Sequence, residues 1–169
     1  MSIRLEVTEE QWLGGLRQAD YVVLDLDLDQ PRPWLEDAVQ QAELIGRCTG
    51  PADQELLDRA LELDVDFLSI AGVAENFDAR RLPLRLIVEQ QMGEAAHSLD
   101  LFGAAWARRI SAWGPEDRQA LEALARRERI FLGAPHTLPE TDWLELVAPF
   151  ALAVPANCDH VAVARIRTV

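Results

Sequence analysis

Residues 21–28 read Tyr-Val-Val-Leu-Asp-Leu-Asp-Leu, and their alternation decides the fold class. A strand over this stretch has an apolar face and an acidic face, with Val22, Leu24, Leu26 and Leu28 on one and Asp25, Asp27 and Asp29 on the other. The central strands of an open doubly wound sheet are covered on both faces and read as continuous apolar runs. An apolar side against helices and a polar side facing inward is instead typical of a (β/α) barrel.

The same alternation recurs in other predicted strands. In residues 3–7, Ile3, Leu5 and Val7 lie on one face and Arg4 and Glu6 on the other. In residues 84–88, Leu84, Leu86 and Val88 form the apolar face, and Arg85 lies on the opposite face together with the following Glu89. Further strands are predicted at the positions 44–47, 65–70, 129–133, 150–154 and 161–166. These make eight candidates along the chain.

Helices are predicted between most of these strands. Thr8 and Gln11 form a capping-box pattern that opens a helix over 8–18. Others are expected over 35–42, 53–63, 115–127 and 140–147. The longest is predicted over 94–111, because apolar residues recur there at steps of three and four and are expected to pack against the sheet or a partner chain: Leu99, Phe102, Trp106, Ile110, with Trp113 continuing the pattern.

Alternating strands and helices predict an α/β fold with a mostly parallel sheet, as a single domain over 1–169. A typical barrel takes about 250 residues. We therefore expect a compact or degenerate (β/α) barrel in preference to an open doubly wound sheet. An antiparallel α+β sheet with one solvated face produces the same alternation and stands as a further alternative.

Charge excludes several functions. The net charge is −13, and the first 66 residues carry sixteen of the 29 acidic side chains against five arginines. This balance argues against nucleic acid and against anionic membranes as partners. The chain has no lysine, which excludes Schiff-base chemistry and the usual P-loop. The N-terminus has no long apolar run and no stretch approaches a membrane span, so we expect a soluble, cytoplasmic protein.

Two groups of residues are candidates for chemistry. Asp25, Asp27 and Asp29 follow one another about 7 Å apart on one strand face, where a carboxylate could act as a general base or, with its neighbours, hold Mg²⁺. The second group lies where parallel strands end, since active sites of α/β folds lie there. It includes Ser69, Glu89 and His136. Cys48, Cys158, His136 and His160 are residue types that bind zinc, although no CxxC or HxxxH spacing is present among them.

Residues 22–27 also resemble the first motif of the haloacid-dehalogenase-like phosphatases, with Ser69 ending a later strand. The chain has no lysine for that family's phosphate-binding position, and Leu28 follows Asp27 where the family has a small polar or β-branched residue. We therefore do not assign the family.

The favoured interpretation is a small-molecule enzyme, a lyase, isomerase or phosphate-handling enzyme, with its site at the C-terminal ends of the strands. Asp25 and Asp27 would supply acid–base chemistry, Arg85 would bind a small anionic metabolite, and His136 would lie on the wall. The alternative is a non-catalytic regulatory, adaptor or immunity-type module whose acidic first third binds a basic protein. The sequence identifies no cofactor. It also predicts that Leu24 and Leu26 are almost fully buried.

Overall fold

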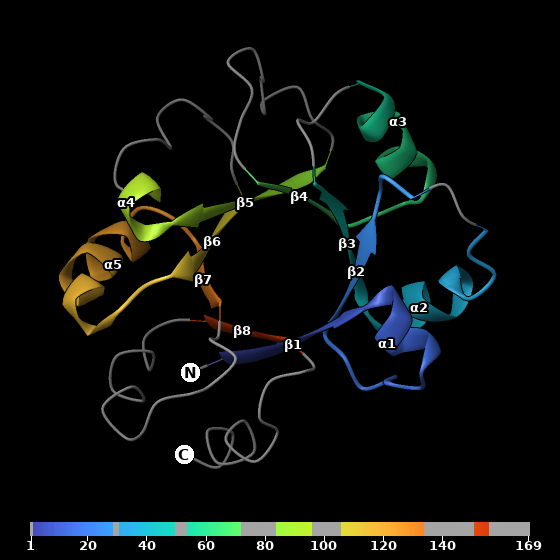
Figure 1. Ribbon diagram of the computed structural model, residues 1–169, viewed down its shortest axis with the longest axis horizontal. Helices are drawn as coiled ribbons and strands as arrows, with labels where there is room; N and C mark the ends of the chain where they lie inside the picture. The colour runs from blue at the N-terminus through green and yellow to red at the C-terminus, as the bar shows by residue number, and fades with distance from the viewer. Residues whose placement is uncertain are drawn as a thin grey trace.

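Eight parallel strands form a closed barrel in the part of the chain that the structure describes, residues 2–28, 31–49, 54–71, 84–95, 106–133 and 151–155 (Figure 1). The structure is a computed structural model. In chain order the elements are β1 (Ser2–Thr8), α1 (Glu9–Leu13), β2 (Tyr21–Asp25), α2 (Leu35–Gln41), β3 (Glu43–Cys48), α3 (Gln54–Glu62), β4 (Phe67–Ala71), β5 (Arg85–Gln91), α4 (Met92–Ala95), β6 (Ala107–Ala112), the 3₁₀ turn η3 (Pro115–Asp117), α5 (Arg118–Ala125), β7 (Ile130–Gly133) and β8 (Ala151–Pro155).

Each strand pairs in parallel with its successor in the sequence, and β8 pairs with β1 to close the ring. Ser2 lies opposite Ala151 at this closure, and the two strands run side by side in Figure 1. The barrel interpretation is therefore confirmed. A closed, all-parallel ring excludes both the open doubly wound sheet and the antiparallel α+β alternative.

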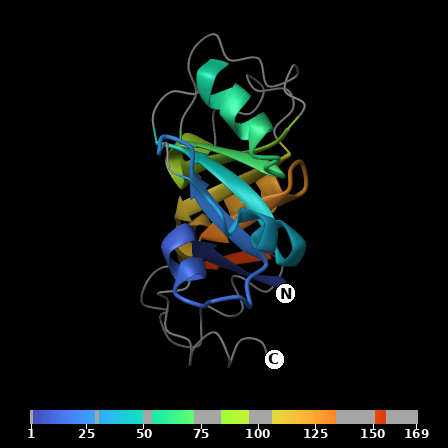
Figure 2. The same ribbon diagram turned by 90° about the vertical axis from the view of Figure 1, so that its right-hand side faces the viewer.

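The outer face of the strands carries the main apolar layer, and the described helices lie outside the ring (Figures 1 and 2). Leu24 and Leu26 are both fully buried in this layer, as predicted. Helix α1 contributes Trp12 and α2 contributes Ala38, both also fully buried. At roughly 25 cal/mol per Å² of apolar surface removed from water, this layer is the principal source of stability.

The inside of the barrel is filled by a second apolar cluster. Its buried members are Tyr21, Ile45, Phe67, Ile87, Ala107 and Phe131. The Phe67 ring contacts Tyr21 edge-on at a centroid distance of 5.9 Å and Trp106 at 4.8 Å, and Trp106 stacks on Phe131 at 6.3 Å. This cluster makes the barrel a packed core rather than a pore.

The helix predicted over 94–111 is wrong. The chain forms the four-residue helix α4 and then strand β6, with residues 96–105 outside the described part. A step of four is compatible with both periods, since it returns to the same side of a helix and, being even, of a strand. Ile110 is indeed buried, but on the outer face of β6, and Trp106 precedes that strand and packs inside the ring.

Two other elements are shorter than predicted. Helix α1 has the predicted Thr8–Gln11 capping box but ends at Leu13, because Gly14 and Gly15 follow and Gly15 adopts a φ of 99°. Leu13 and Leu16 are consequently exposed. Strand β2 ends at Asp25 rather than at residue 28. The predicted helix 140–147 and strand 161–166 lie outside the described residues.

None of the described helices is both long enough and apolar enough to cross a lipid bilayer.

Candidate active site

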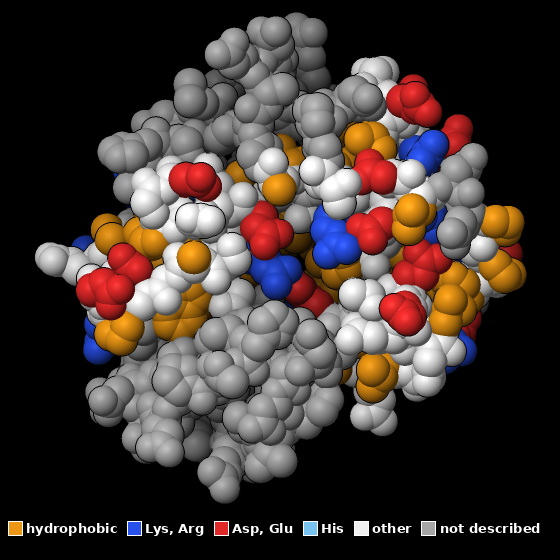
Figure 3. Space-filling model, in the orientation of Figure 1, with side chains coloured by type: hydrophobic (Ala, Val, Ile, Leu, Met, Phe, Trp, Pro, Cys, Tyr) orange, Lys and Arg blue, Asp and Glu red, His pale blue; other side chains and the backbone are white. Residues whose placement is uncertain are grey.

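A cavity of about 260 Å³ opens at the C-terminal end of the barrel, and we call it the mouth cavity. Strand β1 and α1 contribute Glu6, Val7, Thr8 and Gln11 to its wall, and the other strands contribute Val23, Ile45, Arg47, Ser69, Ile87, Glu89 and Arg109. Figure 3 shows acidic and basic side chains gathered around a hollow in the middle of the molecule. A concave site with a few convergent charged groups above an apolar floor is typical of small-molecule sites.

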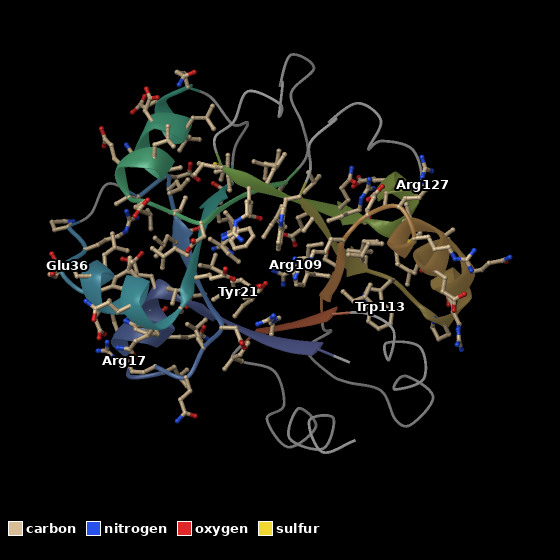
Figure 4. All side chains as sticks on the ribbon, turned by 180° about the vertical axis from the view of Figure 1, so that it is seen from behind. Arg17, Tyr21, Glu36, Arg109, Trp113 and Arg127 are labelled. Carbon is tan, nitrogen blue, oxygen red and sulfur yellow. The ribbon has the colours of Figure 1, made fainter. Side chains whose placement is uncertain are left out.

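The central feature of the mouth cavity is an ion pair across the barrel. Arg109 Nη1 donates to Glu6 Oε2 at 2.6 Å, although the two residues are 103 positions apart in the chain. The Glu6 side chain is 11% exposed and that of Arg109 is 23% exposed. Figure 4 shows the labelled Arg109 pointing into the ring of strands. Alternation explains this, because Arg108 points outward and Arg109 therefore points inward.

Burial shifts the pKa of Glu6. Loss of hydration raises the pKa of this carboxyl above its ordinary value of 4.5; Arg109 opposes the rise, while Glu89 adds to it. A carboxyl with a raised pKa in a cavity is suited to give and take a proton near neutral pH.

Arg47 and Asp25 form a second ion pair beside the mouth cavity. Arg47 Nε donates to Asp25 Oδ1 at 2.8 Å and Nη2 donates to Oδ2 at 3.1 Å. This two-point contact fixes the guanidinium in one plane, and it raises the pKa of Arg47. Asp25 is the last residue of β2, and its carboxylate orients the Arg47 guanidinium.

Asp27 lies beyond the end of β2 on the exposed rim. Its carboxylate accepts hydrogen bonds from the backbone N–H of Thr49, at 3.1 Å, and from the Thr49 hydroxyl. These bonds lower the pKa of Asp27. A solvated carboxylate with a lowered pKa is a poor proton acceptor at neutral pH.

Two arginines hold the chain segment that follows β2. Arg32 Nη2 donates to the carbonyls of Asp25, at 2.8 Å, and Leu28, at 3.1 Å. Arg59 Nη1, from α3, donates to the Leu26 carbonyl at 2.5 Å. These bonds fix the rim next to the Arg47–Asp25 pair.

Arg85 does not share a site with Asp27. It begins β5 and thus lies at the N-terminal end of the barrel, where its Nη2 contacts Glu43 Oε1 at 3.3 Å and Asp66 Oδ1 at 3.4 Å. Its guanidinium also lies over the Phe67 ring at 4.0 Å. The prediction that Asp27 and Arg85 share one pocket is therefore wrong. Asp27 follows the C-terminal end of β2, whereas Arg85 begins β5, so the two residues lie at opposite ends of the parallel barrel. Arg85 and Glu89 do share a side of β5, but they lie at its opposite ends.

A broader depression of about 580 Å³ lies at this N-terminal end, and its wall includes Arg4, Asp20, Glu43 and Asp66. Its aspartates are engaged with strand ends, since Asp20 accepts from the Leu5 N–H at 2.8 Å and Asp66 from the Leu44 N–H at 2.9 Å. We assign these groups to barrel stability.

Ser69 and Glu89, which were predicted at strand ends, line the mouth cavity. The other predicted residues form no described site. Asp29, His136, Cys158 and His160 lie outside the described part of the chain, and Cys48 is buried in the outer apolar layer. Among the described residues no three His, Cys, Asp or Glu side chains are grouped so as to hold a metal ion.

Sequence reasoning missed Glu6, Arg47 and Arg109 as a group. Glu6 is visible as an inward-facing residue of the first strand, and its position at that strand's C-terminal end is the available signal. Arg109 was hidden by the helix predicted over 94–111.

Comparison with solved structures supports the fold assignment. The chain superimposes on the N-(5'-phosphoribosyl)anthranilate isomerase of Pyrococcus furiosus with a TM-score of 0.63, 12% identity and coverage of 99% of this chain and 100% of that one. The fold is a parallel β/α barrel. A phosphoribosyl anthranilate isomerase solved with reduced 1-(o-carboxyphenylamino)-1-deoxyribulose 5-phosphate gives 0.61 and 15%, covering 92% of this chain and 88% of that one. TrpF from Jonesia denitrificans gives 0.56 and 14%, with coverage of 92% and 87%.

No protein-family model matches the chain, and no curated protein matches it. At these identities the structural likeness establishes the fold, and the chemistry has to be argued from the mouth cavity itself.

Proposed function

We propose that the chain is a small-molecule isomerase that acts on a small anionic metabolite in the mouth cavity. The observation that carries this proposal is the buried Glu6–Arg109 pair on the cavity wall. It combines a group able to move a proton with a cation able to hold an anion, within one enclosed space. The barrel's structural neighbours, one of which was solved with a phosphorylated sugar derivative, support the same class of reaction.

The proposal gives each charged group a role. Glu6 transfers the proton, because its carboxyl is buried and its pKa is raised. Arg109 binds the anionic group of the substrate. Arg47 is held by Asp25 at the same opening, so its guanidinium has a fixed orientation on the cavity wall. Glu89 places a second carboxyl group on the same wall.

Activity is the first test. Purified protein should be incubated with N-(5'-phosphoribosyl)anthranilate, the substrate named for the structural neighbours. We expect turnover that Glu6→Gln lowers by a factor of about 10²–10⁴, the usual contribution of a general acid or base. Arg118→Leu is the matched control, because Arg118 lies exposed on α5 and pairs only with Glu122 in the described residues. Full activity in Glu6→Gln would contradict the assigned role.

Binding is tested separately, by calorimetric titration with reduced 1-(o-carboxyphenylamino)-1-deoxyribulose 5-phosphate. We expect Arg109→Leu to weaken binding at least tenfold and Arg118→Leu to leave it unchanged. Wild-type protein that neither binds this compound nor turns over the substrate would contradict this substrate class. It would favour the alternative of a non-catalytic module that uses its acidic first third.

A further inference from the structure

The guanidinium of Arg109, on the wall of the mouth cavity, has donor capacity beyond its bond to Glu6. A guanidinium carries five N–H donors, and Nη1 is the one bonded to Glu6. The Nε atom is buried and has no hydrogen-bond partner within the described residues. A buried donor without a partner has lost its hydration without gaining a hydrogen bond, so a further acceptor at this position stabilises the site.

The charges around the mouth cavity oppose a simple anion site. Among the described residues that line the cavity, Arg47 is already neutralised by Asp25, which leaves the carboxylates of Glu6 and Glu89 against the guanidinium of Arg109. An anion arriving at Arg109 therefore meets the two carboxylates of Glu6 and Glu89, which are both negative when ionised. In a cavity of low dielectric this repulsion is strong.

We propose that an anionic ligand binds the fork of Arg109 together with one proton, and that Glu6 receives this proton from solvent. This inference rests on the proposed function, since it concerns the same cavity. Neutral Glu6 removes one negative charge and frees Arg109 to form a two-point contact with an oxyanion. Binding of substrate then leaves Glu6 protonated, so that it can donate a proton in the reaction.

The titratable and charged groups that face Glu6 are consistent with Glu6 as the proton acceptor. They are Tyr21 on β2, Arg47 on β3, Glu89 on β5 and Arg109 on β6. Glu6 is about nine-tenths buried and Arg109 is its hydrogen-bonded cation. When an anion takes part of that cation's charge, Glu6 loses most of what keeps it ionised.

Inorganic sulfate is a suitable probe, because it keeps two negative charges and takes up no proton from pH 5.5 to 8.5. Its Kd should be measured by titration calorimetry across this range at constant ionic strength. We expect the wild-type Kd to rise with pH, approaching tenfold per unit above the pKa of Glu6. Pairs of buffers with different ionisation heats should show uptake approaching one proton for each sulfate bound.

Variants separate the parts of the inference. Glu6→Gln should bind sulfate with a Kd that no longer depends on pH and with no proton uptake. Arg109→Leu should lose the binding. Arg109→Lys, which keeps the charge beside Glu6 but lacks the fork, should weaken binding while retaining the pH dependence. Glu122→Gln, on the exposed face of α5, is the control for a lost carboxylate.

The failures are distinguishable. Sulfate binding that depends on Arg109 but not on pH would overturn the proton coupling and leave the isomerase proposal standing. Proton-coupled sulfate binding without any isomerase activity would support the proton coupling and overturn the isomerase proposal. No binding by the wild-type protein at any pH, or binding that Arg109→Leu retains, would overturn the anion site on which both rest.

Discussion

The burial of Glu6 has a consequence for stability as well as for chemistry. Its folded-state pKa is raised above the ordinary 4.5, so the protonated form favours the folded state. The contribution is fully present below about pH 4.5 and is lost as the pH rises through the folded-state pKa.

Glu6→Gln stays neutral throughout, so we expect its stability relative to wild type to increase as the pH rises from 4 to 8. Urea denaturation at several pH values measures this difference. Glu122→Gln is the control, because it shows how the loss of a carboxylate at an exposed position changes the free energy of unfolding with pH. A difference between Glu6→Gln and wild type that does not change with pH would show that Glu6 is not perturbed by burial.

A second buried charge, Arg108, lies on the outer face of β6 and is fully buried. Its Nε donates to Glu128 Oε2 at 2.9 Å, and its Nη1 donates to Gln90 Oε1 at 2.7 Å and to the Ala95 carbonyl at 2.6 Å. Removing one partner of a buried pair typically costs about 3–5 kcal/mol.

We therefore expect Arg108→Met to lower the free energy of unfolding by about that amount. Arg118→Met, which breaks the exposed pair with Glu122, should cost no more than about 1 kcal/mol. Chemical denaturation of the two variants compares them directly. Equal effects would mean that the Arg108 network is solvated.

Individual residues were predicted unevenly for a physical reason. Leu24 and Leu26 follow from alternation alone, because a slip of one position would bury three carboxylates among the helices. Asp25 lies at the C-terminal end because β2 stops there and not at residue 28, and its pairing with Arg47 depends on the register between β2 and β3, which the sequence does not state. The Glu6–Arg109 contact joins β1 to β6 across the barrel and is beyond any local pattern.

At the scale of elements, Gly46 of β3 lies against Leu26, which follows β2, and leaves no room there for a side chain. A Cβ added to Gly46 would lie 2.9 Å from Leu26 Cδ1, and Leu26 is fully buried. Overpacking of this kind typically costs about 1–3 kcal/mol.

We expect Gly46→Ala to destabilise the barrel by that amount. The added methyl group should cost much less in a Leu26→Ala background, where the colliding atoms are absent. A double-mutant cycle by denaturation measures the coupling. Additive effects would contradict the close approach of these two residues.

Elements with a full alternating pattern were predicted well, whereas β6 was not. Its sequence, Ala-Arg-Arg-Ile-Ser-Ala, has arginines on both faces and too few apolar residues to show a period of two. Burial of Arg108 in a polar network and of Arg109 in the mouth cavity makes this strand possible, and both depend on tertiary partners.

At the scale of the whole molecule, the two ends of the barrel differ in what the charges do. The N-terminal end holds an aromatic cluster below Arg85 and Arg129, with Arg129 lying over the Trp106 ring at 4.2 Å. The C-terminal end holds the mouth cavity. This division matches the general rule that barrels place stability at one end and chemistry at the other.

The aromatic cluster gives a prediction for Trp106. Trp106→Ala should cost roughly 3–5 kcal/mol, because the ring fills the barrel interior between Phe67 and Phe131. Thermal and chemical denaturation measure the loss. An unchanged unfolding midpoint would place the ring outside the packed interior.

The most direct measurement of the central claim is nitrogen-15 NMR of the arginine Nε–H groups during titration with reduced 1-(o-carboxyphenylamino)-1-deoxyribulose 5-phosphate. Arg109 and Arg85 are assigned by Arg→Lys substitution, one at each end of the barrel. If the mouth cavity is the site, the Arg109 Nε–H resonance moves to the chemical shift of a strong hydrogen bond, while that of Arg85 stays in place. A shift at Arg85 without one at Arg109 would move the ligand to the N-terminal end and contradict the site.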